Sequence, residues 1–120
     1  MLIGKLVSLL SHLPEAIASA EQEVVSATRI LKEAEDALAF KEATLILEGK
    51  ITGKNEMERK AQLLALTVEE RRAVAEAQEK LAVARLNYNK VVNEFKAARA
   101  IAQLFSQLSG EAPAQKEQAS

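Results

Sequence analysis

Cysteine is absent from this 120-residue sequence, and only four glycines, two prolines and 3% aromatic residues are present. Without cysteine the chain has no disulfide framework, no thiolate nucleophile and no thiolate metal site. Sheets favour β-branched and aromatic residues joined by turn formers, so the scarcity of aromatic residues and turn formers argues against a sheet protein. Without disulfides, the fold must be stabilised by side-chain packing alone.

Neither a large charge imbalance nor a long apolar run is present. The formal net charge is -1, which gives no sign of a nucleic-acid binder or of an acidic tail. No stretch approaches the roughly 18 consecutive apolar residues of a membrane span. The N-terminal segment carries Lys5, a short apolar run and small residues, but polar residues interrupt the run and Glu15 follows it, unlike a signal peptide. We therefore expect a cytoplasmic protein with no membrane segment.

Alanine, leucine, glutamate, lysine, glutamine and arginine, the strong helix formers, supply much of the chain, which indicates an all-α fold. From Pro14, a favourable first helical residue, apolar residues recur every seven positions, with alanines three places after the first three: Ile17, Val24, Leu31, Leu38 and Leu45, with Ala20, Ala27 and Ala34. This pattern predicts a helix over 14–48 that ends at Gly49 and has a closely packed partner.

A second helix is predicted over 56–108. Asn55 and Glu58 form a capping-box pattern at its start. Two heptad rows follow, Val74, Leu81, Tyr88, Phe95 and Ala102, then Ala77, Ala84, Val91, Ala98 and Phe105. An earlier apolar stripe is out of phase with them, Met57, Ala61, Leu64 and Val68, and Thr67 opens a second capping-box pattern. The helix either carries a stutter at Thr67 or breaks there. We favour continuity because neither glycine nor proline interrupts it.

The segment before Pro14 is strongly apolar and predicts a short helix over 2–12, which Pro14 ends. Antiparallel pairing of the two long helices places this short helix beside Phe95, Ile101, Leu104 and Phe105. The expected architecture is a single helical domain over 1–109, a long antiparallel, coiled-coil-like helical hairpin with a turn at 49–55. Residues 110–120 are expected to form a disordered C-terminal tail.

The stretch EGKITGKN at 48–55 includes this turn and contains two glycines and two lysines, so we compare it with a phosphate-binding loop. Such a loop needs four residues between its glycines, Ser or Thr after the Gly-Lys pair and a preceding strand. Here three residues separate the glycines, Asn55 replaces Ser or Thr, and a helix precedes. The turn and cap residues are therefore predicted to be structural: Gly49, Gly53, Asn55 and Glu58. The basic residues nearby are alternative candidates for contact with an anion or nucleic acid: Lys50, Lys54, Arg59, Lys60, Arg71 and Arg72.

No catalytic, cofactor-binding or metal-binding residue emerges, so we expect neither an enzyme nor a cofactor. Helical carboxylate-bridged metal sites need two Glu-x-x-His units, whereas this chain has a single histidine, His12. Tyr88 falls in a core row, and the carboxylates lie on helix faces expected to be solvated.

The stretch Gly53–Val74, GKNEMERKAQLLALTVEERRAV, resembles one found in small phage and prophage-encoded helical proteins of unknown function. It covers about a fifth of the chain. The matching residues are Gly53, Lys54, Asn55, Glu56, Glu58, Arg59, Ala61, Gln62, Leu63 and Thr67. The resemblance implies a phage or mobile-element origin without supplying a mechanism.

Many apolar residues lie outside the heptad rows, and a two-helix hairpin buries only one stripe on each helix. We therefore expect a structural or interaction protein that forms a homodimer, with two hairpins building a four-helix bundle. The candidate interface residues are Phe40, Ile46, Leu47 and Leu86. Another protein is a further possible partner, and a phage nucleic-acid accessory protein that uses the basic residues near the turn is the alternative function.

Overall fold

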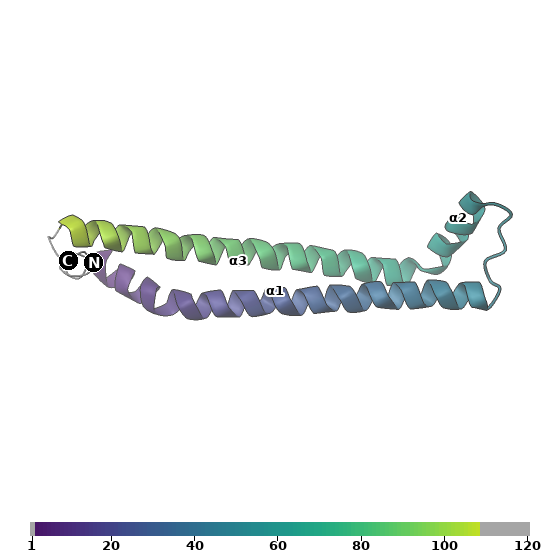
Figure 1. Cartoon of the computed structure of the whole chain (residues 1–120), viewed down its shortest axis with the longest axis horizontal. Helices are drawn as coiled ribbons and strands as arrows, with labels where there is room; N and C mark the ends of the chain where they lie inside the picture. The colour runs from purple at the N-terminus through teal and green to yellow at the C-terminus, as the bar shows by residue number, and fades with distance from the viewer. Residues whose placement is uncertain (1, 109–120) are drawn as a thin grey trace, which may run out of the picture. The chain divides into compact units, whose positions relative to one another are not determined.

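The computed structural model describes the backbone of residues 2–108, which form three α-helices and no strand (Figure 1). Helix α1 spans Leu2–Leu47, α2 spans Glu56–Leu66 and α3 spans Val68–Leu108. The all-α class predicted from composition is therefore confirmed. The tail expected at 110–120 lies outside the described residues.

The chain divides into two compact units, each of which pairs a segment of α1 with a segment of α3. Unit 1 contains the described residues 2–21 and 86–108, and unit 2 contains residues 22–85. The single domain expected over 1–109 stays a prediction.

In unit 1 the N-terminal part of α1 packs against the C-terminal part of α3. Its core is formed by buried Leu6, Leu13 and Ala98, against which partly buried residues pack: Leu10, Ala16, Val91, Phe95 and Phe105. The expected packing of the N-terminal segment beside Phe95 and Phe105 is therefore found, although Ile101 and Leu104 remain exposed.

The predicted helix break at Pro14 is wrong, because α1 continues through it as one helix. Leu6, Leu13 and Ala20 lie seven residues apart and are all buried, so the core-facing stripe passes Pro14 without a change of phase. Pro14 itself is exposed. A helical proline removes one hydrogen bond and crowds the preceding turn. The burial on both sides of Pro14 offsets that cost, and the separate helices at 2–12 and 14–48 do not form.

In unit 2 the predicted heptad rows form the contact between α1 and α3. On α1, Leu45 is buried and Val24, Leu31 and Leu38 are partly buried. On α3, Leu81, Ala77 and Ala84 are buried, and Val74 is partly buried. Alanine at these positions allows the helix axes to approach closely, as the sequence pattern indicated.

The predicted continuous helix over 56–108 is also wrong, because α2 ends at Leu66 and α3 begins at Val68. Thr67 separates them with φ -125° and ψ 28°, outside helical geometry. Its side chain is fully buried and its hydroxyl bonds to the Leu63 carbonyl oxygen. The helix therefore breaks at Thr67 without a glycine or a proline, at a residue whose buried hydroxyl has a hydrogen-bond partner. Helix α2 has no buried residue, and its apolar residues Met57 and Leu64 are exposed.

Candidate functional site

The turn after α1 begins with a glycine that ends the helix. Gly49 has φ +72°, in the left-handed region where glycine is favoured. The backbone N–H of Gly49 donates to the Ile46 carbonyl at 3.1 Å, and that of Lys50 donates to the Leu45 carbonyl at 3.0 Å. This pair of hydrogen bonds is the Schellman motif, which satisfies carbonyls left unpaired at a helix end.

Gln62 of α2 forms hydrogen bonds with the second half of the turn. Its Oε1 atom accepts from the backbone N–H groups of Thr52 at 2.9 Å and Gly53 at 2.8 Å, and its Nε2 donates to the Thr52 hydroxyl at 3.0 Å. Arg59 adds a bond from Nη1 to the Gly53 carbonyl at 3.3 Å. The sequence gives no local signal for this role of Gln62, since no spacing rule connects a turn to a glutamine nine or ten residues later.

Asn55 and Glu58 begin α2. The Asn55 Oδ1 atom accepts from the Glu58 backbone N–H at 2.9 Å, the side-chain half of a capping box. Glu58 reaches back to the backbone N–H of Lys54 at 2.8 Å, one residue earlier than the usual capping box. The backbone donors of Thr52, Gly53, Lys54 and Glu58 therefore all point to protein oxygens, unlike a phosphate-binding loop, whose free N–H groups face the ligand.

Several of the basic candidates pair with acidic side chains. Lys60 lies 3.6 Å from Glu56, and Arg72 lies 3.9 Å from Glu69. These pairs are exposed and contribute little to stability. The two lysines of the turn, Lys50 and Lys54, are exposed. The acids among the bases reduce the positive field that a nucleic acid would require.

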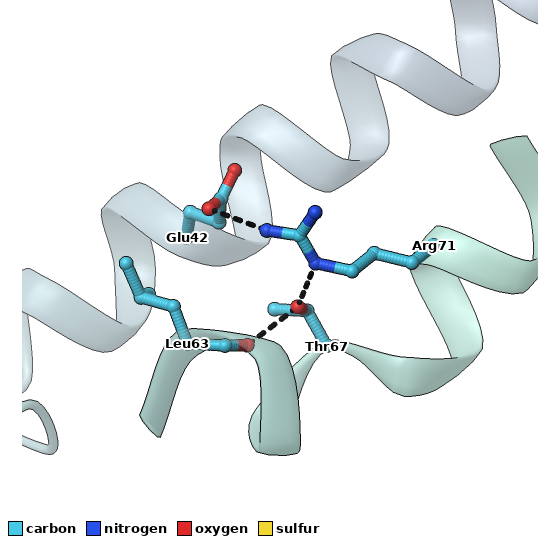
Figure 2. Close-up of polar contacts among 4 residues, drawn as sticks. All are labelled: Glu42, Leu63, Thr67 and Arg71. Carbon is cyan, nitrogen blue, oxygen red and sulfur yellow. Dashed lines mark hydrogen bonds and ion pairs between the residues drawn. The ribbon is translucent and has the colours of Figure 1, made fainter. Parts of the chain in front are cut away.

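Arg71 belongs to a polar network that ties the α2–α3 junction to α1 (Figure 2). Its Nη2 atom lies 3.2 Å from Oε2 of Glu42 on α1, and its Nε donates to the Thr67 hydroxyl at 3.0 Å. That hydroxyl donates in turn to the Leu63 carbonyl. One signal in the sequence pointed to this site, because Thr67 lies seven residues before Val74 and so extends a core row with a polar residue.

Replacing Thr67 by valine is expected to reduce the free energy of unfolding by about 1–2 kcal/mol, because the nearly isosteric change removes a buried donor and acceptor. Thr28 is the matched control, since its exposed hydroxyl only bonds to the Val24 carbonyl at 2.8 Å within α1. We expect Thr28→Val to change stability by less than about 0.5 kcal/mol. Urea denaturation at one protein concentration measures both, and equal effects of the two substitutions would contradict the role given to the network.

The four candidate interface residues lie on the surface of the described structure. In unit 2, Phe40 is 76% exposed, Ile46 57% and Leu47 87%. In unit 1, Leu86 is 69% exposed. Large side chains with such exposure are available for contact with a partner.

Unit 2 also carries a shallow apolar groove between α1 and α3. We name it the alanine groove: its floor is Ala27, Ala77 and Ala84, and its rim is Ile30, Val83, Glu23 and Lys80, with Ser26 beside them. No sequence pattern indicates this groove, because it forms only where two helices distant in the chain lie together.

The described residues contain no group of three or more histidine, aspartate and glutamate side chains placed to hold a metal ion. Within the same residues, no helix combines the length and apolar character needed to cross a membrane. No family model, curated protein or solved structure matches the chain.

Proposed function

We propose that this protein is a non-enzymatic helical scaffold that associates with itself through apolar helix surfaces. In this proposal the chain forms a long antiparallel hairpin, and two hairpins build a four-helix bundle. The origin implied by the resemblance of Gly53–Val74, a phage or prophage, belongs to the same proposal.

One observation carries the proposal. The buried apolar side chains of the described residues are few, and half of them are alanines: Leu6, Leu13, Leu45, Leu81, Ala20, Ala77, Ala84 and Ala98. In contrast, seventeen large hydrophobic side chains are exposed in the same residues. Isolated exposed hydrophobic residues are normal on a monomer, but this ratio resembles half of a core whose other half is supplied by a partner.

Burial of that surface supplies a driving force of adequate size. Fully burying one leucine, isoleucine or phenylalanine side chain is worth about 1.5–3 kcal/mol. Association costs roughly 4–15 kcal/mol in lost translational and rotational freedom. A few of the exposed residues on each copy therefore suffice to offset the cost, and two-fold pairing uses the same residues twice.

Sedimentation equilibrium of the purified chain at micromolar concentration tests the proposal. We expect a mass twice the 13.1 kDa of one chain. A folded monomer under these conditions would contradict self-association. If the monomer nevertheless bound a different protein through the same residues, the scaffold would act on that protein and not on a copy of itself.

A further inference from the structure

The two flanks of the helix contact in unit 2 differ in chemistry. Glu42 lies four residues after the core residue Leu38, whereas Ile30 lies one residue before the core residue Leu31. In a heptad these two positions lie on opposite sides of the core stripe. On one side, the ion pair between Glu42 and Arg71 connects α1 with α3. On the other side, Ile30 borders the alanine groove.

The alanine groove combines a floor of small residues with a rim of larger side chains, two apolar and two charged. Ala77 and Ala84 are 4% and 8% exposed, so the floor has no larger side chain to fill it. Ile30 is 44% exposed and Val83 is 60% exposed, so the rim residues project from the surface. A surface with both small and large residues can pack against a copy of itself, because the large residues of one copy then lie over the small residues of the other.

Charge selects how two copies meet. Within unit 2, the α1 segment 22–47 has five acidic and three basic residues, a net charge of -2, whereas the α3 segment 68–85 has four acidic and four basic residues, a net charge of zero. Pairing α1 with the partner's α1 would bring like charges together. Pairing α1 with the partner's α3 avoids this repulsion, because the α3 segment is neutral overall, and so it is favoured over the other arrangement. The rim agrees, since Glu23 lies on α1 and Lys80 lies on α3.

We propose that the occupant of the alanine groove is the same groove of a second copy. The two-fold axis runs parallel to the helices of unit 2, so that α1 of each copy packs against α3 of its partner. Ile30 then lies close to the partner's Val83, and each of them covers alanines of the other copy. This inference rests on the proposed self-association and specifies its face and its direction.

Substitutions of two matched valines test the face. Val83 is in the groove rim and 60% exposed, whereas Val25 is on α1 outside the groove lining and 56% exposed. We expect Val83→Glu to weaken dimerisation at least about 100-fold, because each dimer would bury two carboxylates against apolar side chains. Val25→Glu should leave the dimer intact, with circular dichroism confirming equal helix content in both variants. A dimer that withstands Val83→Glu refutes the groove while leaving self-association in place, whereas a monomeric wild-type protein refutes self-association itself.

Cross-linking tests the direction, and the absence of cysteine makes every introduced thiol unique. Ile30→Cys and Val83→Cys chains are treated with a short bis-maleimide linker, separately and as an equal mixture. The proposed arrangement gives a covalent dimer in the mixture and little in either variant alone. Strong cross-linking of Ile30→Cys alone would show that α1 packs against the partner's α1 and would overturn the proposed direction. A dimeric protein that cross-links in none of the three samples would place the interface on another face.

Discussion

Replacing Pro14 by alanine is expected to raise the free energy of unfolding by about 3 kcal/mol, the difference between the two residues in a helix interior. Pro14 lies inside α1 on its exposed side. Alanine restores a backbone N–H for the carbonyl four residues earlier and relieves the crowding caused by the proline ring. Because Pro14 is not in the core of unit 1, the substitution should remove no buried contact.

Denaturation at a fixed protein concentration measures this change, since dimerisation would make stability depend on concentration. Ser19→Ala is the matched control, because Ser19 is another exposed residue of α1 where the gain in helix propensity is only about 0.5 kcal/mol. If Pro14→Ala destabilised the protein, or lowered its helix content, a break at Pro14 would be required by the fold, and the separate helix predicted at 2–12 would return to consideration.

Gly53→Ala is expected to destabilise the protein by up to about 3 kcal/mol, the usual cost of forcing an atom into occupied space. A Cβ atom at Gly53 would lie 2.7 Å from the Arg59 backbone nitrogen, 2.8 Å from the Glu58 Cβ and 2.9 Å from the Glu58 carbonyl carbon. Two of these three atoms belong to the backbone of α2. The turn must therefore shift, and the hydrogen bond from the Gly53 N–H to Gln62 is weakened with it.

Gly4→Ala provides the control with the opposite sign. A Cβ atom at Gly4 meets nothing within 4 Å, and Gly4 lies within α1. We expect this variant to gain about 0.5–1 kcal/mol, because alanine loses less backbone entropy than glycine when a helix forms. If thermal denaturation showed the same stability for both variants, the turn would be free to rearrange, and the hydrogen bonds of Gln62 to the turn would not contribute to stability.

Local chemistry was sufficient for the elements that depend on near neighbours in the chain. The heptad rows, the glycine end of α1 at Gly49 and the cap of α2 at Asn55 each follow from residues within seven positions of one another. Such residues share a helix face or a helix end whatever the rest of the chain does, so a pattern read from the sequence survives folding.

The tertiary structure decided the continuity of the helices, where local and long-range terms conflict. Proline inside a helix costs about 3 kcal/mol, but burying Leu6 and Leu13 contributes about 1.5–3 kcal/mol each, so packing outweighs the local penalty and α1 continues. The sequence did contain a signal, since both leucines are in phase with Ala20. At Thr67 the long-range contacts instead favour a break in the helix. The Thr67 hydroxyl bonds to the Leu63 carbonyl and accepts from Arg71, and Arg71 pairs with Glu42, 29 residues away on α1. Partners so distant in the chain meet only after α1 and α3 pair. The sequence by itself thus determined the all-α class and the core-facing stripe of each long helix. The junction of α2 with α3, the hydrogen bonds of Gln62 to the turn and the alanine groove depend on contacts that exist only in the folded chain.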